Sequence, residues 1–232
     1  ASNKFNIASF PYWENVGMVG MGSGVYLGDG WVLTGAHVGC YPFKMSDGSY
    51  YKPIYVTWRV LLNPNGSKTD LAIFRVLFID KTSSLAKLSK IPVGHIKNNI
   101  ELPLIIIGTG YIEKHTPIIA YTTDPILGYN IIHLREKRWA LTTLDKIIEH
   151  PISVADGSTT SCFITVFRNV PFRGHAASGD SGGAAFMYDT TQKQWQLVGC
   201  ILFTSQSGDY VPFGSRTYLG NLSEYISQFP LL

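Results

Sequence analysis

The chain has 232 residues, of which 45% are hydrophobic and 15% are charged, and its formal net charge is +3. This composition excludes a disordered chain and leaves room for one large or two small globular domains that need no disulfides. The one dense basic run, Arg135-Glu136-Lys137-Arg138, is too small for a nucleic-acid surface, so we expect no nucleic-acid partner.

The cysteines and the start of the chain indicate its setting. Cys40, Cys162 and Cys200 allow at most one disulfide and match no zinc signature. Cys162 and Cys200 lie in apolar runs, where we expect buried thiols. The longest apolar run, Leu102 to Ile107, is too short to span a membrane. A start at Ala1 without Met or a signal region fits a mature secreted product or a trimmed chain, and we expect a secreted or periplasmic monomer.

Glycine and proline interrupt the chain at short intervals, and short β-branched or aromatic runs lie between them. Such runs predict strands, and short strands at this spacing are typical of an antiparallel barrel or sandwich. The predicted strands are Val16–Val19, Gly24–Leu27, Trp31–Leu33, Ile54–Val60, Leu71–Phe78, Leu102–Ile107, Pro117–Tyr121, Cys162–Phe167, Ala184–Tyr188 and Trp195–Phe203.

One helix is predicted, near the end of the chain. Asn221 is a suitable N-cap, and four apolar residues follow it with amphipathic spacing: Leu222, Tyr225, Ile226 and Phe229. A polar stretch around residues 80–101 separates two strongly apolar strands and predicts a domain boundary. We therefore expect an all-β fold with a short C-terminal helix, divided into domains of residues 1–90 and 91–232.

The stretch from Gly174 to Ala185 consists mostly of glycine and alanine, so it can contribute little to a core. Glycines flanking Ser181 permit positive-φ turns that aim consecutive N–H groups into one concavity. A hydroxyl beside such donors suits a nucleophile for acyl transfer. The alternative is an ordinary glycine-rich surface loop.

Two residues of the first half suit the same chemistry. Asp29-Gly30 predicts a hairpin turn, and the apolar strand after it ends at His37 beside small residues that leave room for an imidazole. Asp70 begins another apolar strand, where a carboxylate is costly to bury without a hydrogen-bond donor. The alternatives are a structural histidine and an ordinary turn aspartate.

The chain resembles the chymotrypsin/trypsin-type serine protease family in three motifs that follow the family's order: Thr34-Gly35-Ala36-His37, Asp70-Leu71-Ala72 and Gly179-Asp180-Ser181-Gly182-Gly183. The resemblance implies two antiparallel Greek-key β-barrels and a serine endopeptidase that forms an acyl-enzyme. It also implies a protein or peptide substrate and no metal or organic cofactor.

The resemblance assigns a role to each matching residue. Ser181 would be the nucleophile, His37 its general base and Asp70 the group that orients the imidazole. The backbone N–H groups of Gly179 and Ser181 would form the oxyanion hole.

The resemblance also indicates the substrate-binding residues. The strand containing Leu202, Phe203 and Thr204 would pair with a bound peptide. His175 occupies the base of the specificity pocket, where trypsin-like members carry aspartate, so cleavage after lysine or arginine loses its counter-charge. His175, together with Arg216, could favour an acidic side chain. The alternative is that His175 points to solvent and the pocket is mainly apolar.

The chain departs from the animal members of the family in several places. Ala1 to Lys4 does not match the segment whose amine pairs with the aspartate before the nucleophile, so Asp180 should have another partner. The usual cysteines near the histidine and the serine are absent, which indicates a bacterial or viral branch. The family's helper serine aligns with Leu202, or with Thr204 or Ser205 if residues are inserted.

Two other functional classes compete with the enzyme hypothesis. A protease-fold binding protein without activity would usually have lost part of the triad, and all three residues are present here. A thiol-dependent or metal enzyme would need a cluster that neither the cysteines nor the histidines offer.

Overall fold

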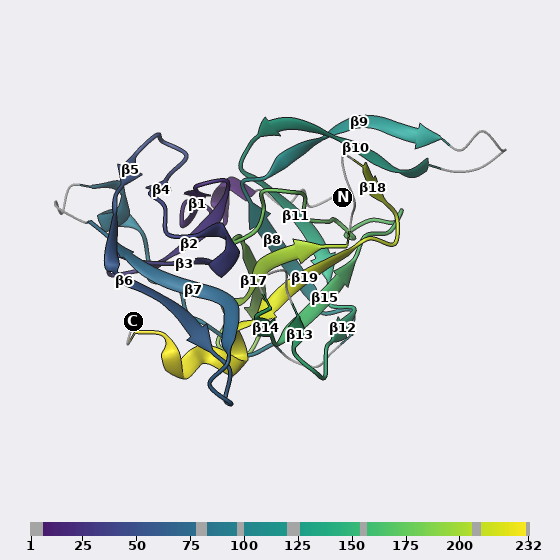
Figure 1. The fold of residues 1–232 in the computed structure, drawn as a ribbon. Helices are drawn as coiled ribbons and strands as arrows, with labels where there is room; N and C mark the ends of the chain where they lie inside the picture. The colour runs from purple at the N-terminus through teal and green to yellow at the C-terminus, as the bar shows by residue number, and fades with distance from the viewer. Residues whose placement is uncertain are drawn as a thin grey trace.

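The structure, a computed structural model, describes residues 7–77, 83–96, 100–119, 126–153, 157–205 and 210–230. The fold is all-β, as the sequence predicts; its helices are short 3-10 helices, and every strand pairing within the sheets is antiparallel. Two seven-stranded sheets make up most of the molecule, and the C-terminal helix lies beneath them in Figure 1.

The first sheet comes from the first third of the chain and has the strand order β5-β4-β1-β2-β3-β7-β6. Its strands are β1 (Val16–Val19), β2 (Gly22–Gly28), β3 (Trp31–Gly35), β4 (Phe43–Lys44), β5 (Tyr50–Tyr51), β6 (Pro53–Leu62) and β7 (Lys68–Val76). The predicted turn joins β2 to β3, and its residues Asp29 and Gly30 have φ of 49° and 83°. A type I′ hairpin turn requires positive φ at both of these positions.

The second large sheet has the order β11-β8-β16-β17-β19-β15-β12. Its strands are β8 (Pro103–Gly108), β11 (Arg138–Thr143), β12 (Lys146–Ile147), β15 (Cys162–Val166), β16 (Ala184–Asp189), β17 (Gln194–Thr204) and β19 (Arg216–Asn221). Two smaller sheets join β9 (Tyr111–Ile119), β10 (Ile126–Arg135) and β18 (Tyr210–Pro212), and β13 (Ile152–Ser153) with β14 (Thr159–Thr160). The β9–β10 hairpin projects from the body of the molecule (Figure 1).

Each predicted strand overlaps a strand of the structure. Residue 78 and residues 120 and 121, at the ends of two predicted strands, lie outside the described residues. The short strands and the longer β10 and β11 were not predicted; in β10 and β11, polar and charged residues interrupt the apolar pattern. The 3-10 helices of the described residues are η1 (Ile7–Ser9), η2 (Ala36–Val38), η3 (Ser84–Lys87) and η4 (Leu222–Gln228).

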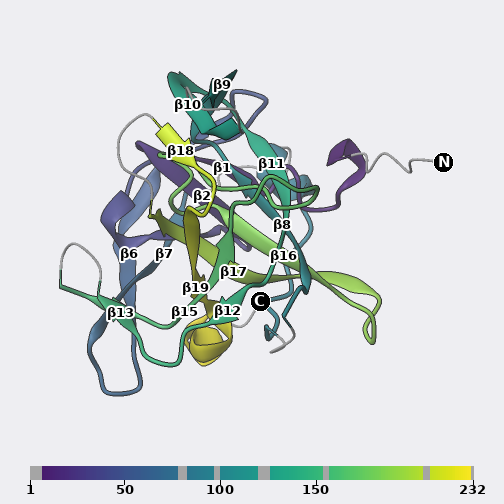
Figure 2. The same cartoon turned by 90° about the vertical axis from the view of Figure 1, so that its right-hand side faces the viewer.

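Each end of the described chain packs on the sheet that the other half of the sequence forms. Phe10 packs edge-on against Phe186 of β16 and Trp195 of β17, with ring centroids 5.0 and 5.2 Å apart. Figure 2 shows the N-terminal segment on the side of β8 and β16. At the other end, the Gln228 side chain hydrogen-bonds both backbone groups of Leu62 in β6. These contacts tie the two sheets together, and the predicted boundary between residues 90 and 91 stays a prediction.

The C-terminal helix forms where the sequence predicts it. The Asn221 side chain accepts a hydrogen bond from Ser223 N at 3.2 Å, which is the expected N-cap. Leu222 and Tyr225 are buried. The helix is a 3-10 helix, with tighter turns than the α-helix that the spacing suggests.

The three cysteines are free thiols. Cys162 in β15 and Cys200 in β17 are both in register with Gly220 of β19, so one strand separates them. Neighbouring strands lie about 4.8 Å apart, which places these cysteines beyond the reach of a disulfide. Both thiols are buried, as predicted. Burial raises the pKa of Cys162 to about 12 and that of Cys200 well above its usual value, so both are unreactive.

Candidate active site

The structure brings His37 and Asp70 together. His37 lies in η2, directly after β3, and Asp70 lies in β7, which pairs with β3 so that Gly35 is opposite Leu71. The two catalytic candidates therefore project from neighbouring strand ends. His37 Nδ1 lies 2.7 Å from Asp70 Oδ2, and the backbone N–H of His37 donates to Asp70 Oδ1 at 2.9 Å. One carboxylate thus holds both the ring and the backbone of the histidine.

Asp70 is buried and its surroundings hold it in place. Its exposed fraction is 1%, whereas the side chain of His37 is 40% exposed. Its backbone N–H donates to Thr160 Oγ1 at 2.8 Å, a contact from β14 that the sequence analysis missed because no local motif marks it. Two positions proposed for the family's helper serine have other contacts. The Leu202 side chain lies in the core, and Ser205 Oγ accepts a hydrogen bond from Arg216 N.

The loop around Ser181 packs against the first sheet. The backbone N–H of Ser23 in β2 donates to the Ser181 carbonyl at 2.6 Å. Gly182 has a φ of 88°, and a Cβ there would collide with the Ser23 carbonyl oxygen, so only glycine fits. The Ser181 hydroxyl donates to the Leu202 carbonyl at 2.9 Å. These contacts place the loop against β2. Strand β2 pairs with β3, which leads to His37.

Two peptide groups in this loop have fixed orientations. Tyr111 N donates to the Ser178 carbonyl at 2.8 Å, and Gly183 N donates to the Asp180 carbonyl at 2.8 Å. In a trans peptide the N–H points opposite to the carbonyl, so the N–H groups of Gly179 and Ser181 point away from these donors. Within the described residues, neither N–H has an intramolecular acceptor, and both remain available to a ligand.

Asp180 has the alternative partners that the sequence analysis expects. Its Oδ1 accepts from Gly110 N at 2.6 Å and its Oδ2 accepts from Ala177 N at 2.8 Å. Burial raises the pKa of this carboxyl group, while the two N–H donors and the nearby charges of Arg138 and Arg135 oppose the increase. The carboxyl group therefore cross-links its own loop to the segment that follows β8.

His175 points into the protein and is half-buried, which differs from the solvent-facing alternative. Its Nδ1 lies 2.9 Å from Thr217 Oγ1, and its ring stacks on Phe167 with centroids 5.6 Å apart. It lines a cavity of about 150 Å³ together with Asp180 and Ile201, among others. Thr217 Oγ1 already accepts a hydrogen bond from Ala176 N, which leaves the threonine proton available to His175.

The other expected substrate-binding residues lie on β17 and β19. Leu202 offers only backbone groups, because its side chain is fully buried. Phe203 is half-buried and stacks on Tyr218 with centroids 4.3 Å apart. Thr204 is in register with Thr217 and is half-buried, whereas Arg216 is exposed.

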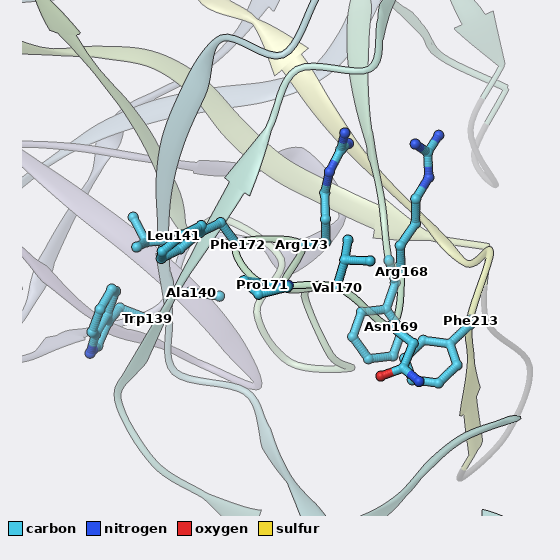
Figure 3. Close-up of a pocket in the computed structure, with 12 residues that line it drawn as sticks. Trp139, Ala140, Leu141, Arg168, Asn169, Val170, Pro171, Phe172, Arg173 and Phe213 are labelled. Atoms are coloured by element: carbon cyan, nitrogen blue, oxygen red, sulfur yellow. The ribbon is translucent and has the colours of Figure 1, made fainter. Parts of the chain in front are cut away.

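A larger cavity of about 550 Å³ lies between β11, the loop of residues 167–174 and Phe213 (Figure 3), and no triad candidate lines it. The guanidinium groups of Arg168 and Arg173 extend to the same side in Figure 3, and both pair with Asp145. Arg173 Nη2 also donates to both carboxylate oxygens of Glu101. These charges are therefore already compensated within the protein.

The described ranges contain neither a metal-ligand cluster nor a membrane-spanning helix. In that part of the chain, no three histidine, cysteine, aspartate or glutamate side chains are grouped so that they could hold a metal ion. None of the helices described is long and apolar enough to cross a membrane.

An all-β fold with a buried aspartate paired to a histidine, beside a Gly-Asp-Ser-Gly loop, defines a candidate serine hydrolase. The family described as immunoglobulin A1 protease, a family of serine peptidases, matches residues 140–220. The matched segment includes Ser181 but neither His37 nor Asp70, and it supports a serine protease. No curated protein matches the chain.

Proposed function

We propose that this protein is a serine endopeptidase of the chymotrypsin type, in which Ser181, His37 and Asp70 form the catalytic triad. The observation that carries the proposal is the double contact between His37 and Asp70, at 2.7 and 2.9 Å, on the strand ends next to the Ser181 loop. The matched serine peptidase family independently supports the coarser part of the proposal, a serine protease, through a segment that contains the serine.

Asp70 would select the reactive form of the imidazole. Its Oδ2 faces His37 Nδ1, and a carboxylate only accepts hydrogen bonds, so the ring proton stays on Nδ1. The lone pair of Nε2 is then available to take a proton. The Ser181 hydroxyl would exchange its bond to the Leu202 carbonyl for one to this nitrogen when substrate binds.

The reaction would proceed in two balanced halves. Ser181 Oγ forms a bond to the scissile carbonyl carbon while its proton moves to His37 Nε2, and the carbonyl electrons collect on oxygen. The C–N bond then breaks, the amine takes the proton from Nε2 and leaves, and an acyl-enzyme remains. Water repeats the sequence, giving its proton to His37 and releasing the acid and the serine hydroxyl.

The N–H groups of Gly179 and Ser181 would form the oxyanion hole. Their lack of intramolecular acceptors in the described chain, and the fixed peptides on which they lie, support this role. Removing one such donor typically costs about 3 kcal/mol of transition-state stabilisation.

The substrate would lie along the backbone of Leu202, Phe203 and Thr204, with its specificity side chain near His175 and Arg216. Position 175 carries a histidine where trypsin-like members carry aspartate, so we propose that cleavage after lysine or arginine is disfavoured. A digest of a peptide library separates an acidic from an apolar preference at this position.

The two-domain organisation and the setting are part of the proposal. Residues 1–90 would supply the histidine and the aspartate, and residues 91–232 the nucleophile, with peptide or protein substrates between them. The enzyme would act as a secreted or periplasmic monomer.

Labelling with a fluorophosphonate tests the proposed chemistry. The wild-type protein should incorporate one label, Ser181→Ala none, and Ser49→Ala, which removes a half-buried turn hydroxyl of the first sheet, one label at the wild-type rate. Equal labelling of wild type and Ser181→Ala would refute the proposal. Absence of labelling in a folded wild type would favour the inactive binding protein.

A further inference from the structure

We propose that Arg135 is a positioning residue that holds the Ser181 loop in its catalytic conformation. The inference rests on the proposed function, because it concerns the loop that would carry the nucleophile and the oxyanion hole. Arg135 lies at the end of β10, far from Ser181 in sequence, and in the sequence it stands out only as part of a small basic run.

The guanidinium of Arg135 cross-links two segments that are distant in sequence. Its Nη1 and Nη2 donate to the carbonyls of Gly20 and Gly22, at 3.0 and 2.7 Å, on the turn between β1 and β2. Its Nε donates to the Thr109 carbonyl at 2.9 Å, after β8. A second bond from Nη2 reaches Thr109 Oγ1 at 3.1 Å.

Each of these two segments holds the Ser181 loop from one side. From the first sheet, Ser23 donates its N–H to the Ser181 carbonyl and its hydroxyl to the Gly179 carbonyl, at 2.6 and 3.2 Å. From the segment after β8, Gly110 N donates to Asp180 Oδ1 at 2.6 Å, and Tyr111 N, at the start of β9, donates to the Ser178 carbonyl and so fixes the peptide before Gly179.

Ser23 and Thr109 connect the two sides directly. The Ser23 hydroxyl accepts from Thr109 N at 2.9 Å and lies 2.9 Å from the Thr109 hydroxyl. Arg135 closes this arrangement, because it binds the residue before Ser23 and also Thr109 itself. A shift of either segment would therefore disturb Gly179 and Ser181 together.

Arg135 also lies directly against the proposed oxyanion donor. A Cβ built on Gly179 would be 3.6 Å from Arg135 Nε and 3.1 Å from the Cα of Gly110. In the described part of the chain Arg135 makes no salt bridge, and the partners of its guanidinium are neutral oxygens on two segments. A half-buried cation used in this way acts through geometry, because its planar fork binds several acceptors at once.

The experiment measures the fluorophosphonate labelling of Ser181 in two ways, as a second-order rate constant and as the final number of labels per protein. Arg135→Gln removes the charge and most of the fork, and Arg135→Lys keeps the charge without the fork. Arg75→Gln is the matched control, because Arg75 also donates to a backbone carbonyl, that of Asp29, outside the Ser181 loop.

We expect Arg135→Gln to be labelled about tenfold to a hundredfold more slowly than wild type, since loss of one oxyanion donor costs about a hundredfold or more. Arg135→Lys should recover only part of the rate, and Arg75→Gln should match wild type. In both Arg135 variants the final labelling should still reach one per protein, because a misplaced loop slows every molecule. A merely structural role would instead lower the final labelling and leave the rate constant unchanged.

The outcomes separate this inference from the proposed function. A wild type that is not labelled defeats the proposed function and this inference with it. A labelled wild type with Arg135→Gln within twofold of its rate defeats only the inference. If Arg135→Gln does not fold, Arg135→Lys decides: slower labelling with a full end point supports the positioning role, and the wild-type rate overturns it.

Discussion

Replacing Asp70 with asparagine tests the proposed mechanism most directly, because the structure determines how the amide must lie. Asp70 Oδ1 accepts the backbone N–H of His37, and Oδ2 faces His37 Nδ1. In Asp70→Asn, the amide oxygen should keep the backbone bond, since the opposite orientation would set NH₂ against that N–H and cost about 1–3 kcal/mol. The NH₂ group then faces Nδ1.

This orientation moves the ring proton. An NH₂ group donates, so His37 Nδ1 must accept, and the proton shifts to Nε2, which can then no longer take the proton of Ser181. Loss of this base function costs about 10⁴-fold in rate, or about 5.4 kcal/mol at the transition state. The fold should be almost unaffected, because the amide matches the carboxylate in size.

The assay is again the rate of fluorophosphonate labelling, together with hydrolysis of an unstructured protein substrate and a thermal unfolding curve. Asp189→Asn provides the matched control: Asp189 accepts from Thr191 N and Gln192 N in the β16–β17 hairpin, outside the proposed triad. A folded Asp70→Asn variant that keeps more than a third of the wild-type rate would show that the aspartate does not set the tautomer and would refute the reasoning.

Three further predictions concern stability. Phe10→Ala empties a site that is 5% exposed and should lower the free energy of unfolding by about 3–5 kcal/mol in a denaturant titration; a loss below 1 kcal/mol would show that the N-terminal segment does not hold the sheets together. Gly182→Ala should destabilise the protein by more than about 1 kcal/mol and abolish labelling, because φ is 88° and the Cβ meets the Ser23 carbonyl; normal labelling would contradict the described loop. Burial lowers the pKa of Lys137 from 10.5 to about 8, so the folded state binds fewer protons than the unfolded state between these values and stability rises with pH there. Lys137→Met should therefore be more stable than wild type at pH 7, by at most about 3 kcal/mol, and the difference should shrink above pH 10; equal unfolding midpoints at pH 7 would contradict this.

Local patterns predicted much of the fold. The β-branched and aromatic runs became strands, the Asp29-Gly30 turn has the two positive φ values of its type, and Asn221 caps the terminal helix. Strand β10 was not predicted because a glycine and polar residues interrupt the apolar pattern of its sequence. Propensity alone is weak where pairing with a neighbour decides the structure.

The basic run at residues 135–138 shows what a pattern of charge leaves open. In sequence it is a small cluster that excludes a nucleic-acid surface. In the structure Arg135 donates to backbone carbonyls, Arg138 donates to the Tyr111 carbonyl at 2.7 Å, and Lys137 lies over the Trp13 ring at 4.5 Å. The two arginines therefore bind backbone carbonyls that other segments bring to them, whereas the lysine packs on an aromatic ring.

By itself, the sequence determined the all-β class and the identity of the three candidate catalytic residues, since both depend on residue types within a few neighbouring positions. Only the tertiary structure decided which groups support them: Gly110, which donates to Asp180; Thr160, which binds the backbone of Asp70; and Arg135, which lies beside Gly179. These contacts join positions tens of residues apart, and the pairing of strands that creates them leaves no local mark in the chain.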